Sequence, residues 1–456
     1  MTTTVSTIRE GRLSVQRERI LRTARHTGFG LPFWLTVLYL AFEYGRPQNS
    51  LPALGYLHLP GVVTVSLGLA LLTSGRVDLS NIQTKLFMVF LGLIAALVPF
   101  AVNNFVAFYT TIGMMLLFVA YLAIVNFVDS FEKFQVMINT WVGIHLYLAI
   151  SSIIKKGTGI GGFLADENDF ALALNMIIPF SFFLALEAKT QSKRIWFLVI
   201  TGIFVVSDAA TSSRGGFIGL VAVGLYCWFR SPRKLMSAMA VLLLIFTILQ
   251  FAPQGYWDRM NTITTDTDDP NGTGQDRLYS WKAAWKMFLD YPILGVGPEN
   301  FPWNFSDYEP PGGFGGTATD TGRLHGGRAA HSLYFTLIPE LGIVGIILYA
   351  WMVLSSLRDL RLIRKRIREK PQQLEEDKYF RERVRYLTLA LGGSLPGFLV
   401  SGTFLSVLYY PNFWIWMALV VALKRQVISS VAVPERVRYR WARPLKQSQR
   451  SMSLPS

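Results

Sequence analysis

The chain has 456 residues, of which 51% are hydrophobic, 14% aromatic and only 16% charged, and its mean hydropathy is +0.35. Ordinary soluble domains carry about 25% charged residues. The charge is absent from whole segments, such as 86–128 and 135–154, which alternate with short basic clusters. Uncharged stretches of this length are typical of membrane-spanning helices. The composition therefore excludes a soluble enzyme, a fibrous protein and a disordered scaffold, and it indicates a polytopic membrane protein.

The formal net charge of +15 would favour a nucleic-acid partner if the protein were soluble. In a membrane protein the same excess has a simpler source, because cytoplasmic loops are enriched in Lys and Arg. We therefore expect membrane lipids, and no nucleic acid, as partners. The single Cys227 lies within an apolar run, which excludes a disulfide framework and a cysteine-based metal site.

The apolar runs predict an all-α fold with about twelve transmembrane helices. They lie near 31–46, 60–74, 84–102, 105–127, 134–154, 169–187, 194–210, 213–229, 235–251, 332–356, 386–403 and 408–424. The first follows a basic stretch that has no small-residue cleavage site after it, as in an uncleaved signal anchor. Only a tight turn separates the two runs within 194–229, and they could be read as one interrupted helix. The count of twelve is therefore accurate to about one span either way.

One orientation satisfies the positive-inside rule along the chain, and it places both termini in the cytoplasm. It divides the chain into a basic cytoplasmic segment (1–30), spans 1–9 (31–251), a large outer loop (252–331), spans 10–12 (332–424) with a cytoplasmic loop (357–385), and a basic cytoplasmic tail (425–456). Within the outer loop, residues 278–289 space Trp281, Trp285 and Phe288 at helical intervals. This pattern predicts an amphipathic helix that lies on the membrane surface or packs on the bundle.

Two arginines are candidate anion-binding residues on the outer face. Arg214 lies in the turn TSSRGG at 211–216, where its charge breaks the loop bias; the alternative is an interfacial anchor that reaches lipid headgroups. Arg277 precedes the amphipathic helix and offers a planar fork that fits phosphate; the alternative is a solvated loop arginine. The GVGP turn at 295–298 follows no strand, so a dinucleotide-binding interpretation is rejected.

His331 is the candidate catalytic residue, in the run that opens the tenth span. A helix N-terminus disfavours the imidazolium form, and neutral imidazole is what a general base needs. The alternative is a histidine at the membrane interface whose hydrogen bonds are satisfied and which has no catalytic role. Glu340 lies two turns into the same span, after Pro339. A buried carboxylate in a membrane helix needs a partner, and we expect an arginine.

Other polar groups are weaker candidates. The acidic run 166–169 precedes the sixth span, where helix capping is a sufficient explanation. The run DTDDPNGTGQD at 266–276 is a poor calcium loop, because its glycine comes one position late and Pro270 occupies a ligand position. His145, in the middle of the fifth span, is expected to be a hydrogen-bonded core residue. No metalloprotease, serine hydrolase or NTPase motif occurs in the sequence.

Three motifs in this order resemble the O-antigen ligase family. They are TSSRGG at 211–216, Arg277 before PILGVGPENF at 292–301, and HSLYFTLIPELGIVG at 331–345. That family includes lipopolysaccharide O-antigen ligases, O-antigen and exopolysaccharide polymerases, and bacterial protein O-oligosaccharyltransferases. Two earlier stretches, 43–52 and 161–180, also resemble its members, and the similarity covers roughly 40–425.

The resemblance implies a metal-independent, inverting glycosyltransferase without a cofactor, in a lipid-donor-type (GT-C-like) architecture. The donor would be a glycan on undecaprenyl diphosphate at the periplasmic face of the inner membrane. The acceptor would be lipid A-core or a growing glycan. By the same resemblance, Arg214 and Arg277 would hold the donor diphosphate and His331 would sit at the acceptor hydroxyl, with Glu340 as the acidic residue of the span motif.

The alternative from another class is a flippase or exporter of lipid-linked glycans. A transporter would be expected to place its charges near the bilayer midplane, whereas these candidates gather on one face. Within the family, ligase, polymerase and protein O-oligosaccharyltransferase remain open, because they share the donor and differ in what offers the hydroxyl.

Overall fold

The computed structural model describes residues 28–50, 52–55, 58–75, 77–159, 161–232, 234–235, 237–238, 273–308, 328–369 and 375–432. Several sequence predictions lie outside this part of the chain. They concern the basic N-terminal segment up to residue 27, most of the ninth span, the calcium-like run up to residue 272, and the tail after residue 432.

Every regular element among the described residues is a helix. The first half contains α2 (Leu31–Tyr44), α3 (Pro47–Ser50), α4 (Pro52–Gly55), α5 (Leu59–Thr73), α6 (Ile82–Leu97), η1 (Val98–Phe100), α7 (Asn104–Phe127), α8 (Phe131–Ile154), η2 (Gly162–Leu164), α9 (Glu167–Glu187), α10 (Gln191–Ala210) and α11 (Arg214–Arg230). The second half contains α14 (Thr273–Asp290), α15 (Phe301–Asn304), η3 (Phe305–Tyr308), α16 (Leu333–Glu369), α17 (Glu375–Ser401), η4 (Gly402–Phe404) and α18 (Pro411–Ala432).

Six helical segments in the described chain are long and apolar enough to cross a membrane. They are Ile82–Phe100, Asn104–Phe127, Phe131–Ile154, Glu167–Glu187, Leu333–Glu369 and Lys378–Phe404. Each overlaps a predicted span, and the shorter apolar helices α2 and α5 overlap two more. The all-helical character predicted from the sequence is thus confirmed for the described residues, and six of their helical segments have the length and composition of membrane spans. The number twelve and the GT-C-like architecture stay predictions.

The segment 357–385 differs from its prediction as a loop, because most of it is helical. α16 continues to Glu369 and α17 begins at Glu375. Basic side chains such as Arg358 and Arg361 are exposed on α16, while Leu360, Ile363 and Ile367 on the opposite face are buried. Hydropathy ends a span where charge begins, but an amphipathic continuation at helical spacing keeps the helix intact.

Two helices form the centre of the bundle. Every residue from Phe413 to Leu423 of α18, and from Phe170 to Ser181 of α9, is buried. A helix that is apolar all round is typical of such a core position. Asn175 of α9 donates hydrogen bonds to the backbone carbonyl of Gly216 in α11 (2.8 Å) and to the hydroxyl of Ser401 in α17 (3.2 Å). These polar contacts hold three helices together beneath one end of the bundle.

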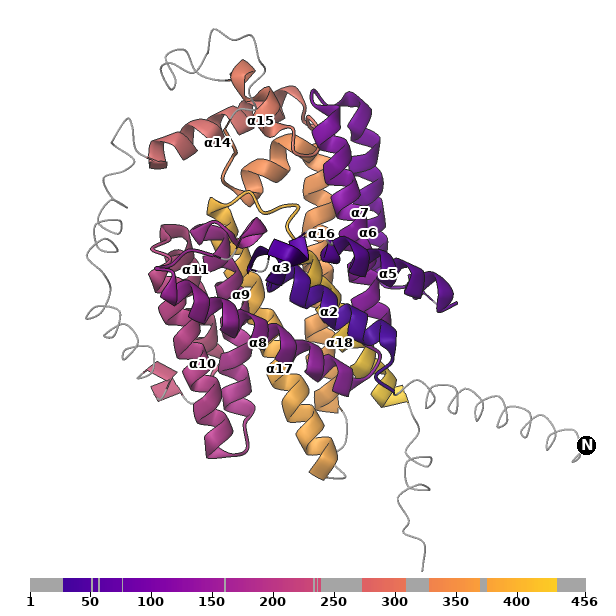
Figure 1. Ribbon diagram of the computed structural model, residues 1–456, viewed down its shortest axis with the longest axis vertical. Helices are drawn as coiled ribbons and strands as arrows, with labels where there is room; N and C mark the ends of the chain where they lie inside the picture. The colour runs from indigo at the N-terminus through magenta and orange to yellow at the C-terminus, as the bar shows by residue number, and fades with distance from the viewer. Residues whose placement is uncertain are drawn as a thin grey trace, which may run out of the picture.

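The described part of the outer loop forms a helical cap on that end, which is the upper end in Figure 1. α14 packs on α16 and η3, so it lies on the bundle. Its buried face is made of small or flexible residues: Ala283, Ala284 and Met287. Trp285, one of the aromatic residues spaced at helical intervals, is 49% exposed. The prediction of a helix is confirmed, but the large aromatic residues do not form its most buried face.

α16 is interrupted at Gly342 (φ 57°, ψ −160°), and the segment 292–297 of the cap fills the interruption. Four backbone hydrogen bonds join them: Val296 N–H to the Pro339 carbonyl (2.9 Å), Gly297 N–H to that of Glu340 (2.9 Å), Ile343 N–H to that of Pro292 (2.8 Å), and Val344 N–H to that of Ile293 (3.3 Å). The helix thereby keeps its backbone groups satisfied although its own ladder is broken. A Cβ on Gly295 would lie 2.3 Å from the carbonyl carbon of Glu340, so only glycine fits there.

Candidate functional site

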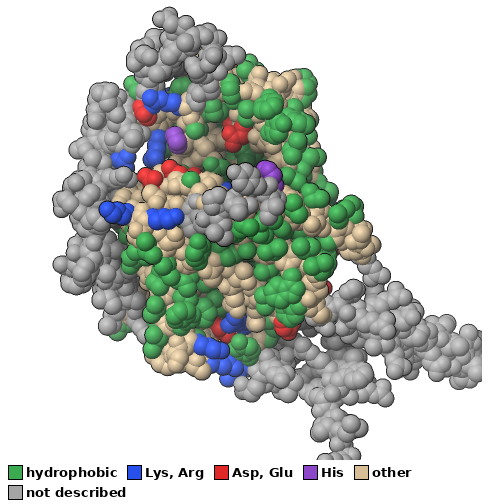
Figure 2. Space-filling view, viewed as in Figure 1, with side chains coloured by type: hydrophobic (Ala, Val, Ile, Leu, Met, Phe, Trp, Pro, Cys, Tyr) green, Lys and Arg blue, Asp and Glu red, His purple; other side chains and the backbone are tan. Residues whose placement is uncertain are grey.

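A cavity of about 400 Å³ lies between the cap and the end of the bundle. Its walls come from the start of α9, the first turns of α14, the segment before α16, and the connection from η4 to α18. They comprise Asp166, Asn168, Asp169, Asp276, Arg277, Ser280, Arg328, Ala329, His331, Phe404, Leu405, Ser406 and Tyr410. Figure 2 shows charged and histidine side chains gathered in this upper region, while the flank below is mainly hydrophobic. The cavity is thus a polar site at one end of an apolar bundle.

His331 lies on the cavity wall immediately before α16. Its backbone is in the left-handed region (φ 45°), and the next residue, Ser332, accepts the N–H of Phe335 as a helix cap (3.4 Å). Non-glycine residues in this region often occur at functional sites. Partial desolvation lowers the pKa of His331; Arg277 and Arg328 lower it further, while Asp166 and Asp276 oppose them. The neutral imidazole is therefore favoured, as a general base requires.

Arg277 enters the same cavity from the first turns of α14. Its guanidinium lies 5.7 Å from the centre of the Phe404 ring, within the range of a cation–π contact. One turn further on, the ring of Trp281 stacks on that of Phe335 in α16, with 5.0 Å between centroids and 15° between planes. This stacking joins the helix that carries Arg277 to the helix that follows His331. The sequence prediction placed both residues on the outer face, and they share one cavity.

Arg214 is the first residue of α11 and does not line this cavity as described. Two cavity residues nevertheless contact its neighbours. The hydroxyl of Ser213 donates to the side-chain oxygen of Asn168 (2.6 Å), and Gly215 packs closely against Phe404. The hydroxyl of Ser213 also accepts the N–H of Gly216 (2.9 Å), which caps α11. The TSSRGG turn therefore forms a rim next to the cavity, with Arg214 at its edge.

Comparison with known proteins bears on this arrangement. Residues 197–350 match the family model described as O-antigen ligase. The resemblance to the O-antigen ligase family is confirmed over this stretch. The stretch contains Arg214, Arg277, His331 and Glu340, and it indicates an enzyme of the O-antigen ligase kind. The search of curated proteins gives no match.

Glu340 has partners other than the expected arginine. Its carboxylate accepts the backbone N–H groups of Glu299 (2.9 Å) and Phe301 (3.2 Å) and the hydroxyl of Tyr409 (2.8 Å). The side chain is 1% exposed. Backbone donors satisfy a buried carboxylate without a second buried charge. Glu340 of this O-antigen-ligase-like stretch thus fixes the cap to α16, and it does not line the cavity.

The cavity residues that were not singled out as site residues from the sequence include Arg328, Asp276, Asp166 and Tyr410. Arg328, in the segment just before His331, forms an ion pair with Asp276 of α14. Asp166 caps α9, as predicted, because its carboxylate accepts the N–H of Asn168 (2.8 Å); yet it also lines the cavity. Tyr410, immediately before α18, also lines the cavity. The acidic run before the sixth span was the available signal, and helix capping alone explained it.

The cavity contains carboxylates and a histidine, which are common metal ligands. Within the described part of the chain, no three such side chains are grouped closely enough to hold a metal ion. The cationic groups there are the guanidiniums of Arg277 and Arg328. Guanidinium groups can stabilise phosphate charge directly, by paired hydrogen bonds. His145, away from this site, is a buried core residue that contacts the backbone carbonyl of Trp141 (2.8 Å), as expected.

Proposed function

We propose that this protein transfers a glycan from undecaprenyl diphosphate to an acceptor hydroxyl at the periplasmic face of the inner membrane. It is an O-antigen-ligase-like or surface-polysaccharide-polymerase enzyme that inverts the anomeric centre and needs no metal. The observation that carries the proposal is the shared cavity of Arg277 and His331, at one end of an apolar bundle and within the O-antigen ligase match.

The arginines hold and activate the leaving group. When the bond between the sugar and the diphosphate breaks, negative charge grows on the diphosphate oxygens. Arg277 and Arg328 line the cavity and can form paired hydrogen bonds to those oxygens. Arg214, on the adjacent rim, reaches the lipid side of the same group. Their combined charge replaces what a divalent cation would otherwise supply.

His331 activates the acceptor. The acceptor hydroxyl oxygen attacks the anomeric carbon on the side opposite the diphosphate, and the new glycosidic bond forms as the old one breaks. The hydroxyl proton passes to the neutral imidazole of His331, whose pKa is lowered by desolvation and by Arg277. Attack from the opposite side inverts the configuration. The energy comes from the phosphosugar bond, so no nucleotide is required.

The size and place of the cavity fit this chemistry. About 400 Å³ is within the range of small-molecule sites, enough for a diphosphate with the first sugar. The lipid chain would lie along the apolar flank of the bundle and the rest of the glycan outside the cap. A transporter would need its polar groups near the middle of the bilayer. Here they lie at the start of α9 and of α16.

A transfer assay tests the proposal. The purified chain receives lipid-linked donor and acceptor glycan with EDTA present throughout. We expect full wild-type activity and a loss of about 10²–10⁴-fold in His331→Ala. His58→Ala is the matched control, because His58 also precedes a helix with a left-handed backbone (φ 44°) but is absent from the cavity wall. Normal transfer by His331→Ala would reject the base assignment, and inhibition of the wild type by EDTA would reject metal independence.

A further inference from the structure

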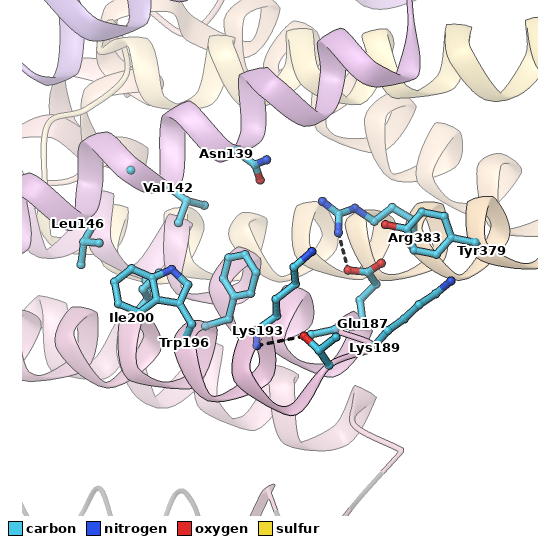
Figure 3. Close-up of a pocket in the computed structure, with 14 residues that line it drawn as sticks. Asn139, Val142, Leu146, Glu187, Lys189, Lys193, Trp196, Ile200, Tyr379 and Arg383 are labelled. Carbon is cyan, nitrogen blue, oxygen red and sulfur yellow. Dashed lines mark hydrogen bonds and ion pairs between the residues drawn. The ribbon is translucent and has the colours of Figure 1, made fainter. Parts of the chain in front are cut away.

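A second cavity, of about 770 Å³, lies at the opposite end of the bundle. Its walls come from α8, the turn between α9 and α10, the first half of α10, and the first turns of α17, as Figure 3 shows. α9 connects the two cavities: its cap Asp166 lines the first and its last residue, Glu187, lines the second. A helix of 21 residues spans about 30 Å. The second cavity is therefore too distant to be part of the candidate catalytic site.

Three basic side chains and one acidic side chain line this cavity. Arg383 forms an ion pair with Glu187, which leaves the charges of Lys189 and Lys193 in excess. The Nε of Arg383 is buried and has no hydrogen-bond partner among the described residues. In Figure 3 the side chain of Lys193 extends toward the Arg383 guanidinium. The ammonium of Lys189 lies 4.1 Å from the centre of the Tyr379 ring. The polar end of the cavity thus carries a net positive charge and an unused donor.

The rest of the cavity wall is apolar. Trp196 and Ile200 of α10 face Val142 and Leu146 of α8 across it (Figure 3). Trp196 is 58% exposed, and Lys193 lies one turn before it on the same helix. From Lys193 to Ile200 the wall runs about 10 Å along the helix axis. A basic end therefore continues into an apolar groove that is open at the side of the bundle.

We propose that this cavity binds one anionic phospholipid, with its phosphate held by Lys193, Lys189 and Arg383 and an acyl chain in the groove beside Trp196. A phosphate diester carries one negative charge, which offsets one of the two excess lysine charges, and its oxygens can accept a hydrogen bond from the Nε of Arg383. The acyl chain covers apolar surface that free phosphate would leave exposed. The predicted orientation places this end in the cytoplasmic leaflet, so the lipid anchors the bundle on the side away from transfer.

The test measures lipid binding to the purified full chain by native mass spectrometry, with dioleoyl phosphatidylglycerol and dioleoyl phosphatidylcholine as probes. We expect one tightly bound molecule of phosphatidylglycerol, and an affinity for phosphatidylcholine that is at least tenfold lower. In the double variant Lys189→Gln/Lys193→Gln, phosphatidylglycerol should bind about 10- to 30-fold more weakly, since each basic side chain near a lipid surface contributes about fivefold. The matched control is Lys282→Gln/Lys286→Gln, two exposed lysines four residues apart on α14, which should bind as the wild type.

Two further arms separate the sources of the phosphate. Trp196→Ser should weaken the binding of phosphatidylglycerol. Inorganic phosphate at the same concentration should fail to displace the bound lipid. Equal affinity for both lipids, an unaffected double lysine variant, or displacement by phosphate would each overturn the proposal. The double variant should also keep wild-type glycan transfer in phosphatidylcholine nanodiscs. Loss of transfer there would assign the lysines to the donor and would equally overturn it.

Discussion

The indole N–H of Trp281 donates a hydrogen bond of 3.0 Å to the backbone carbonyl of Ala330. Trp281 lies one turn after Arg277 on α14, and Ala330 immediately precedes His331. This single bond therefore joins the element that carries the proposed donor-binding arginine to the segment that carries the proposed base. Their relative position depends on this bond together with the stacking of Trp281 on Phe335 and the Arg328–Asp276 ion pair.

Replacement of Trp281 tests this dependence. Trp281→Phe keeps the stacking on Phe335 but removes the indole donor, and it should reduce the rate of transfer about fivefold, the equivalent of a neutral hydrogen bond of about 1 kcal/mol. Trp281→Ala removes both contacts and should cost far more. The control is Trp285→Ala, because Trp285 is half exposed on the same helix. Wild-type rates in both Trp281 variants would contradict the positioning role.

The pH dependence of transfer reports on His331. Because the neutral imidazole is the base, the rate should fall as pH decreases through the pKa of His331, which is lowered from the ordinary 6.5. Arg328→Gln removes a positive charge and should raise this pKa, moving the acidic limb to higher pH. Asp276→Asn removes a negative charge and should move it to lower pH. Measured profiles of kcat/KM that fail to move, or move in the reverse sense, would exclude this charge network.

The arginines should control donor binding. Arg277→Ala and Arg214→Ala should abolish transfer and weaken the binding of the donor, while the protein still inserts into the membrane and accumulates. Lysine should rescue poorly at both positions, because a point charge does not reproduce paired hydrogen bonds. Lys282→Ala, an exposed cation on α14, serves as the control. Titration of purified variants with lipid-linked donor measures the effect, and full activity in both alanine variants would refute the diphosphate assignment.

Glu340→Gln should destabilise the fold. The amide can accept at one atom only, so it leaves a backbone N–H of the cap or the Tyr409 hydroxyl without an acceptor, at a cost of about 1–3 kcal/mol. Glu369→Gln, at the exposed end of the same helix, should have little effect. Thermal unfolding in detergent compares the two variants. Equal melting temperatures would show that the carboxylate is not needed to fix the cap.

Membrane topology follows from the distribution of Lys and Arg. A reporter fused near Gly313 should be exposed on the periplasmic side and one fused near Lys370 on the cytoplasmic side. Protease or alkylation accessibility in intact cells measures both. If the two reporters lie on the same side of the membrane, the orientation and the periplasmic site are both wrong.

Local sequence features predicted the helices well, and non-local contacts explain most of what they missed. The spans near 105–127 and 169–187 were predicted within two residues, because hydropathy over a window is a local property. Hydropathy does not distinguish a lipid-facing helix from a central one. The burial of every residue from Phe413 to Leu423 in α18 was therefore not predictable, since lipid and core are equally apolar.

The site shows the same division. Arg277 and His331 were predicted from their motifs and line one cavity, but the place of Arg328 in the same wall involves an ion pair with Asp276, 52 positions earlier in the chain. The partners of Glu340 were mispredicted for a related reason. Backbone N–H groups of the cap satisfy it, and backbone groups leave no trace in amino-acid composition.

The interruption of α16 by the 292–297 segment has a practical consequence for making hybrid proteins. Main-chain atoms form the joint, so side chains at Ile293 and Leu294, which are exposed, can change without loosening it. Gly295 and Gly342 cannot be replaced, because a Cβ on Gly295 would lie 2.3 Å from the carbonyl carbon of Glu340 and a Cβ on Gly342 would lie 2.4 Å from the carbonyl oxygen of Ile293. A chimaera that imports the 252–331 segment of a protein from the O-antigen ligase family must therefore import the first three turns of α16 with it. A graft cut at residue 331 would join an imported 292–297 segment to a native α16 whose main chain is not complementary to it.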